Sequence, residues 1–278
     1  MAINWYPGHM VKAKREIEEN IKLVDIVLIL VDARAPLSCR NMDLEEIAKK
    51  KKIIYVLNKK DLIKKEDTNK HLRNFKEEGF WVTAIDSIKG KGSKDVINTI
   101  KLAYKPLAEE MVKRGRRVRP ARVMVVGVPN VGKSTFLNNL VGKKMAKTGA
   151  KPGLTRGKQW VRIREDIEFM DTPGLMWPKV ESEEQGLKLA LLSLVGENAY
   201  DNEEVAIFLV EYLKKTFSQT LKEKYKIESL DKEIGEILIE IARKRGHIYK
   251  GGDVNIQKTY QLILNDFRKG FLGKICLD

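Results

Sequence analysis

The feature that most constrains the fold is a glycine-rich segment at residues 127–134, which reads GVPNVGKS. It matches the phosphate-binding pattern G-x-x-x-x-G-K-[ST] at every fixed position, and it lies between an apolar run and a helical pattern. The glycines allow successive backbone N–H groups to face a phosphate. We expect Lys133 to bridge the β- and γ-phosphates and Ser134 to hold Mg²⁺. The nucleotide contacts expected from this segment are Asn130, Val131, Gly132, Lys133, Ser134 and Thr135.

A second motif, Asp171-Thr172-Pro173-Gly174, follows the apolar run Ile167–Met170. At this distance from a phosphate loop, an aspartate that ends a strand is expected to hold Mg²⁺ through water, which is the role predicted for Asp171. The backbone N–H of Gly174 can bind a γ-phosphate. Thr155 lies in a glycine- and proline-punctuated loop between the two motifs, and we expect it to close onto Mg²⁺ when the γ-phosphate is present.

A third motif, Asn58-Lys59-Lys60-Asp61, matches the guanine-reading pattern N-K-x-D. The Asp61 carboxylate can accept hydrogen bonds from N1–H and the exocyclic amine of guanine, and adenine would leave that carboxylate unpaired. Asn58 can bind the base edge and the neighbouring loop, while the stem of Lys59 covers the base face. Thr83-Ala84 loosely resembles the [ST]-A element whose backbone also contacts guanine. Together the motifs predict a GTPase that binds GTP and GDP.

The order of the motifs is reversed, because the guanine-reading motif comes before the phosphate loop along the chain. A sheet can be cut at one connection and rejoined at another without changing the site. The sequence therefore predicts an α/β P-loop GTPase domain with circularly permuted motif order.

The pattern of apolar residues divides the chain into two parts. Short apolar runs alternate with helical patterns in residues 1–178, which predicts a mostly parallel sheet with helices on both faces. From residue 179 to 278 apolar residues recur at three- and four-residue spacing, which predicts an all-helical C-terminal domain. The strands expected are Val24–Val31, Ile53–Leu57, Phe80–Ile85, Arg122–Val126 and Ile167–Met170. The helices expected are Met10–Lys22, Asp43–Lys50, Thr68–Glu78, Leu187–Leu194, Glu203–Leu221, Asp231–Lys244 and Ile256–Phe267.

The net charge of +15 is unevenly distributed. Residues 179–278 hold 16 basic and 17 acidic side chains, so the first 178 residues hold 37 and 21, a net charge of +16. This excess favours a polyanionic partner, most simply RNA; a lysine-rich surface is the alternative explanation. The basic run at 113–120 is either a solvated linker or an RNA-phosphate contact. The chain has no continuous apolar stretch of membrane-spanning length, no secretion-type leader and two isolated cysteines, which favours the cytoplasm.

Over nearly its whole length the chain resembles the circularly permuted GTPases of large ribosomal subunit assembly, typified by RbgA (YlqF). The resemblance includes residues 5–10 (WYPGHM), residues 32–36 (DARAP) and the permuted motif order. It implies a cytoplasmic enzyme that binds immature large subunits through ribosomal RNA and leaves on GTP hydrolysis, without membrane or DNA partners. It further implies that Arg243, Lys244 and Arg245 of the helical domain contact the RNA; a solvated basic helix end is the alternative.

Hydrolysis requires a group that orients water, and Leu175 stands where many GTPases have a glutamine. The resemblance suggests that His9 takes over this catalytic role, since imidazole titrates near neutrality. Asn130 suggests a potassium ion that supplies positive charge at the phosphates, in addition to Mg²⁺. Two rival functions stay open: a GTP switch acting on a protein or membrane, and an RNA-binding scaffold that does not hydrolyse its nucleotide.

Overall fold

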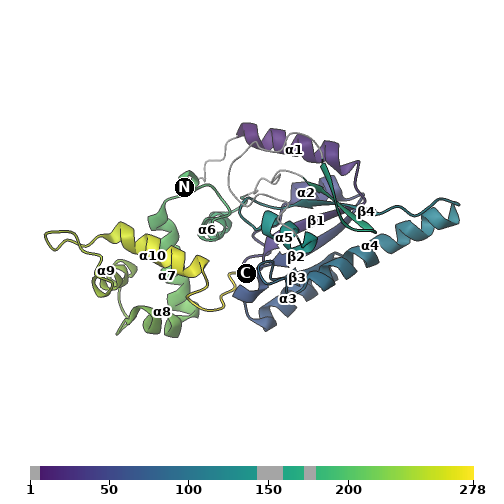
Figure 1. The fold of residues 1–278 in the computed structure, drawn as a ribbon. Helices are drawn as coiled ribbons and strands as arrows, with labels where there is room; N and C mark the ends of the chain where they lie inside the picture. The colour runs from purple at the N-terminus through teal and green to yellow at the C-terminus, as the bar shows by residue number, and fades with distance from the viewer. Residues whose placement is uncertain (1–6, 143–158, 172–179) are drawn as a thin grey trace. The chain divides into compact units, whose positions relative to one another are not determined.

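The computed structural model describes residues 7–142, 159–171 and 180–278 of the chain (Figure 1). These residues form two compact units. The first, the GTPase unit, contains the described residues up to Asp171 together with residues 276–278, and the second, the helical unit, spans Val180–Ile275.

The GTPase unit is built on a six-stranded sheet with the strand order β3-β2-β1-β4-β6-β5. Neighbouring strands are parallel except for β5, which pairs antiparallel with β6 at one edge. The strands are β1 (Ile26–Asp32), β2 (Lys52–Asn58), β3 (Trp81–Ile85), β4 (Ala121–Val126), β5 (Gln159–Arg164) and β6 (Ile167–Asp171).

The middle of the sheet is covered on both faces. All seven residues of β1 are buried, and because successive side chains of a strand point to opposite faces, both faces must be packed. The expected strands all occur with small shifts at their ends. β5 was not expected, because its sequence QWVRIR mixes apolar and charged residues as an edge strand does, instead of forming a continuous apolar run.

The helices of the GTPase unit follow the strands in alternation. The α-helix not expected from the sequence is α4, whose buried residues recur at helical spacing although Pro106 lies inside it. The full set is α1 (Pro7–Ile21), α2 (Met42–Ala48), the short 3₁₀ helix η1 (Lys60–Leu62), α3 (Lys65–Glu77), α4 (Ser93–Lys113) and α5 (Lys133–Val141).

The described part of the helical unit contains no strand, as the spacing predicts. The helix expected over Glu203–Leu221 is two helices, because Phe217 leaves the helical backbone region with φ −133° and ψ 44°. The elements are α6 (Glu183–Leu191), the 3₁₀ helix η2 (Glu197–Ala199), α7 (Asn202–Thr216), α8 (Ser218–Tyr225), α9 (Ile234–Lys244) and α10 (Ile256–Arg268).

Residues 276–278, here called the tail, leave the helical unit and pack in the GTPase unit. The backbone N–H of Leu277 donates to the carbonyl oxygen of Arg34 at 2.7 Å. The Asp278 carboxylate accepts from the N–H groups of Leu37 (2.7 Å) and Ser38 (3.0 Å) and from the Ser38 hydroxyl (2.8 Å). The tail therefore fastens the loop that follows β1.

Candidate nucleotide-binding site

The motif residues gather along one edge of the sheet. Asn58 ends β2, Thr83 and Ala84 lie near the end of β3, and the phosphate loop follows β4. Since these strands are parallel, their carboxyl ends meet at the same edge, where open α/β sheets bind ligands. The reversed motif order therefore leaves the arrangement of the site unchanged.

The phosphate loop depends on glycines where the backbone comes close to its neighbours. Gly132, with φ +103°, precedes the first residue of α5, and a Cβ there would lie 2.6 Å from Nδ2 of Asn58. At Gly127 a Cβ would lie 2.7 Å from the carbonyl oxygen of Leu30. The loop is thus pressed against both β1 and the guanine-reading motif, and the N-terminus of α5 with its unpaired N–H groups is available to an anion.

Lys133 lies over this loop. Its ammonium donates to the carbonyl oxygens of Gly127 (2.6 Å) and Val128 (2.9 Å), and burial lowers its pKa to about 8. Phosphate oxygens within reach of this ammonium would favour the charged form and raise the pKa again. Ser134 and Thr135, the next residues of α5, are partly exposed at the same helix end.

Asn58 joins the guanine-reading motif to two other loops. Its Nδ2 donates to the carbonyl oxygen of Val131 at 2.8 Å, and its Oδ1 accepts from the hydroxyl of Ser87 at 2.7 Å. The side chain is almost fully buried. Sequence reasoning placed Asn58 at the neighbouring loop but missed Ser87, which follows β3 just as Asn58 ends β2.

Asp61, the residue expected to read the base, lies in η1 directly after β2. Asp61 is exposed, and its carboxylate has no hydrogen-bond partner among the described residues, so it can accept bonds from a base. Lys60 donates to the carbonyl oxygen of Ala84 at 3.0 Å. Gly92 allows this approach, because a Cβ there would lie 2.4 Å from the same oxygen. The Thr83-Ala84 segment is therefore held beside the guanine-reading motif.

Lys59 does not extend freely into solvent. Its ammonium lies 2.8 Å from the buried carboxylate of Asp32, the last residue of β1, which also pairs with Arg34 at 2.8 Å. Residues 32–36 carry part of the family resemblance, but no role at the site was predicted for them. A sequence signal was present, because these residues directly follow an apolar run, as the guanine-reading motif does.

Four of the predicted site residues have no described side-chain geometry. Thr155 and Gly174 lie outside the described residues. Asp171 is the last residue of β6, beside β4, and His9 lies in the first turn of α1, but the side chains of both are outside the described part. No group of three or more His, Cys, Asp or Glu side chains that could hold a metal occurs among the residues the structure describes. The donor types at this edge, a hydroxyl at Ser134 and a carboxylate at Asp171, nevertheless fit Mg²⁺, which takes few protein ligands and shares the rest with phosphates.

Comparison with known proteins places this site in a family. A family model described as "50S ribosome-binding GTPase" matches residues 122–249. Ribosome biogenesis GTPase A of Bacillus cereus is 38% identical over 278 residues, covering 100% of this chain and 94% of its own length. That of Bacillus licheniformis is 39% identical and covers 100% and 98%. The chain belongs to the ribosome biogenesis GTPase A family.

Solved structures support the same relationship. The GNP-bound YlqF of Thermotoga maritima is 27% identical, with a TM-score of 0.69 over 96% of this chain and 97% of that one. A GDP-bound YlqF structure is 26% identical, with a TM-score of 0.67. The predicted resemblance, the permuted P-loop GTPase fold with a helical C-terminal part and the enzyme class are thereby confirmed. The protein is a GTPase involved in ribosome assembly.

The family also bears on the cofactor. GTPases of this kind use Mg²⁺ with their nucleotide. Within the part of the chain that is described, no helix combines the length and apolarity needed to cross a bilayer.

Proposed function

We propose that this GTPase binds immature large ribosomal subunits in the cytoplasm through ribosomal RNA and leaves them when GTP is hydrolysed. The observation that carries the proposal is that one domain holds a guanine-nucleotide site at the carboxyl ends of its parallel strands and an arginine-lined groove at their amino ends. Such an arrangement gives one domain separate places for a nucleotide and for a polyanionic partner.

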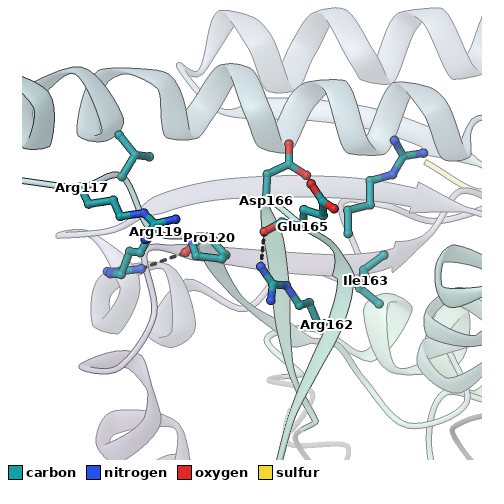
Figure 2. Close-up of a pocket in the computed structure, with 9 residues that line it drawn as sticks. Arg117, Arg119, Pro120, Arg162, Ile163, Glu165 and Asp166 are labelled. Carbon is teal, nitrogen blue, oxygen red and sulfur yellow. Dashed lines mark hydrogen bonds between the residues drawn. The ribbon is translucent and has the colours of Figure 1, made fainter.

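The groove has a volume of about 920 Å³ and lies at the start of β4 and the turn between β5 and β6. Figure 2 shows Arg117 and Arg119 beside Pro120, with Arg162 on the neighbouring hairpin. Its lining residues are Arg117, Val118, Arg119, Pro120, Arg162, Ile163, Arg164, Glu165 and Asp166.

The charges of the groove are unequally available to a ligand. Arg119 is held by Asp25 at 2.7 Å, and the acidic Asp166 is neutralised by Lys101 at 2.7 Å. Arg117 and Arg164 are exposed, and neither forms a salt bridge with a described residue. Arg164 also helps to hold the pKa of the Asp166 carboxyl below its usual value. We assign these two guanidinium groups to phosphates, and they favour RNA contact over a solvated linker for the run at 113–120.

The helical unit supplies fewer available cations than its sequence suggests. Lys244 pairs with Glu240 at 2.9 Å, and Arg245 donates to the carbonyl oxygen of Lys224 at 2.7 Å. Arg243 is exposed and forms no salt bridge within the described residues. We therefore assign Arg243 the main RNA contact of this helix end, with Lys244 and Arg245 exchanging their internal partners for phosphates.

For catalysis we assign Mg²⁺ to Ser134, Thr155 and Asp171, and potassium to Asn130. His9 orients the attacking water in place of the missing glutamine. What supports the role of His9 is its position in the first turn of α1 and the inability of Leu175 to hydrogen-bond through its side chain.

The deciding experiment measures GTP turnover in potassium and in sodium buffers, with and without purified large ribosomal subunits. We expect stimulation by subunits, a faster rate in potassium and loss of the stimulated rate in His9→Ala. Equal rates in the two salts would remove the potassium assignment, and stimulation that survives His9→Ala would move catalysis to another group. No stimulation at all would favour a GTP switch with another partner, and undetectable hydrolysis would favour the scaffold.

The RNA surface is tested by co-sedimentation with large subunits over a range of salt concentrations. The double variant Arg117→Gln/Arg164→Gln should bind less tightly and with a shallower salt dependence. The control Lys70→Gln/Lys76→Gln removes the same charge from exposed positions of α3 in the same unit. Equal losses in the two double variants would mean that net charge alone, and not the groove, drives binding.

A further inference from the structure

The buried carboxylate of Asp32 has two cationic partners, although one of them is enough to balance its charge. Arg34 alone meets it as a fork, with Nε 3.0 Å from Oδ1 and Nη2 2.8 Å from Oδ2, and the Arg34 backbone N–H adds a third bond at 3.1 Å. Both side chains are almost fully buried. A bidentate arginine already balances the charge of a buried carboxylate.

Lys59 is the second partner, with its ammonium 2.8 Å from Oδ2 of Asp32. Strand register produces this contact, because Asp32 pairs with Asn58 in the sheet and Lys59 is the next residue. The backbone of Lys59 is left-handed, with φ +59°, a conformation that a non-glycine residue adopts at an energetic cost. Strain of this kind persists where surrounding structure requires it, and it commonly occurs at functional sites.

We propose that Asp32 is a positioning residue for guanine binding, acting through Lys59. By holding the ammonium, the carboxylate fixes the aliphatic stem of Lys59 where it covers the face of the base beside Asp61. A free lysine loses much rotamer freedom when it is ordered, and a lysine already held loses little. The protein therefore orders this side chain on folding, before the nucleotide arrives.

Arg34 helps to keep the Asp32 carboxylate ionised. Burial would by itself raise the pKa of Asp32, but the Arg34 guanidinium and the Lys59 ammonium together hold it below its usual value. Arg34 is in turn fixed by the tail, since its carbonyl oxygen accepts from the Leu277 N–H. The carboxylate thus stays ionised and available to Lys59.

A double-mutant cycle on Asp32 and Lys59 tests the proposal, with the dissociation constant of mant-GDP as the readout. Asp32→Asn should weaken binding by about tenfold, the effect of losing one preorganised contact. In a Lys59→Met background, which keeps an apolar stem without an ammonium, Asp32→Asn should have no further effect. Equal weakening in both backgrounds would show that Asp32 acts only through the general fold, and would overturn the proposal.

Asp32→Asn removes the carboxylate that forms the buried ion pair with Arg34, so a loss of stability has to be separated from a loss of affinity. The variant Asp32→Asn/Arg34→Gln removes both buried charges, so it should fold and still show the loss of affinity. Its matched control is Arg34→Gln, which keeps the pair of Asp32 and Lys59 and should therefore lose less affinity for mant-GDP than the double variant. If the control loses as much affinity as the double variant, the ion pair of Asp32 and Arg34 serves only the stability of the fold, and the proposal is overturned. Neither result bears on RNA binding, so failure here leaves the proposed ribosomal function untouched.

Discussion

The side-chain amide of Asn58 donates a 2.8 Å hydrogen bond to the carbonyl oxygen of Val131, across 73 residues of sequence. This bond connects the motif that reads guanine to the loop that binds phosphates, with the order of the two reversed along the chain. The site is therefore defined by contacts at the edge of a sheet and not by the direction in which the chain visits them.

We predict that Asn58→Ala weakens both nucleotide binding and the fold. The change leaves the Val131 carbonyl and the Ser87 hydroxyl without their partner, at a cost of about 1–3 kcal/mol of unfolding free energy for buried unpaired groups. Chemical denaturation and mant-GDP titration measure the two effects. Ser87→Ala removes only one bond and should lose less. A larger loss in Ser87→Ala would contradict the central role of Asn58.

We predict that Gly132→Ala abolishes tight nucleotide binding while Gly142→Ala does not. Both glycines have positive φ, so both substitutions incur a backbone cost of roughly 1–2 kcal/mol. Only at Gly132 would the new Cβ meet Asn58, whereas nothing lies within 4 Å of it at Gly142. The difference in mant-GDP affinity between the two variants isolates the contact, and similar affinities would show that Asn58 can move aside.

We predict that GDP binding takes up a proton above about pH 8. Burial lowers the pKa of free Lys133 to about 8, and bound phosphates raise it, so affinity falls as pH rises between these two pKa values. The decrease is at most about tenfold per pH unit. Calorimetry in buffers of different ionisation enthalpy measures the proton uptake directly. In the Lys133→Arg variant the side chain stays charged, so this proton uptake should be absent. The ionisation of guanine itself affects both proteins equally. Identical pH profiles for the two proteins would contradict the prediction.

We predict that Asp278→Ala loosens the loop after β1. The carboxylate accepts three hydrogen bonds from Leu37 and Ser38, and their loss should lower the unfolding free energy by about 1–2 kcal/mol. Hydrogen exchange at the two amides should become faster. Asp253→Ala changes the charge equally at an exposed position of the helical unit, and it should leave these amides unaffected. Unchanged exchange in Asp278→Ala would show that the loop does not depend on the tail.

Local patterns were sufficient to predict the central part of the fold and the site. The phosphate loop, the guanine-reading motif and the buried strands each carry their signal within a few neighbouring residues, so their positions along the chain followed from the sequence. The helix α4 was missed because Pro106 interrupts its pattern, and β5 because a partly exposed edge strand has no continuous apolar run.

The contacts that were missed depend on register and on distant residues. The pair of Asp32 and Lys59 exists because β1 and β2 align with Asp32 opposite Asn58, which the sequence of neither strand specifies. The contact of Leu277 with Arg34 joins residues 243 positions apart in the sequence, and no local pattern predicts it. Such contacts are visible only once the tertiary structure is known.

The docked tail determines how the helical unit is connected to the GTPase unit along the chain. The chain passes from the GTPase unit into residues 180–275 and then returns, so the helical unit is an insertion with two connections and not a terminal appendage with one. The GTPase unit is therefore a discontinuous domain, assembled from a long segment and the three residues 276–278, with about a third of the protein inserted between them.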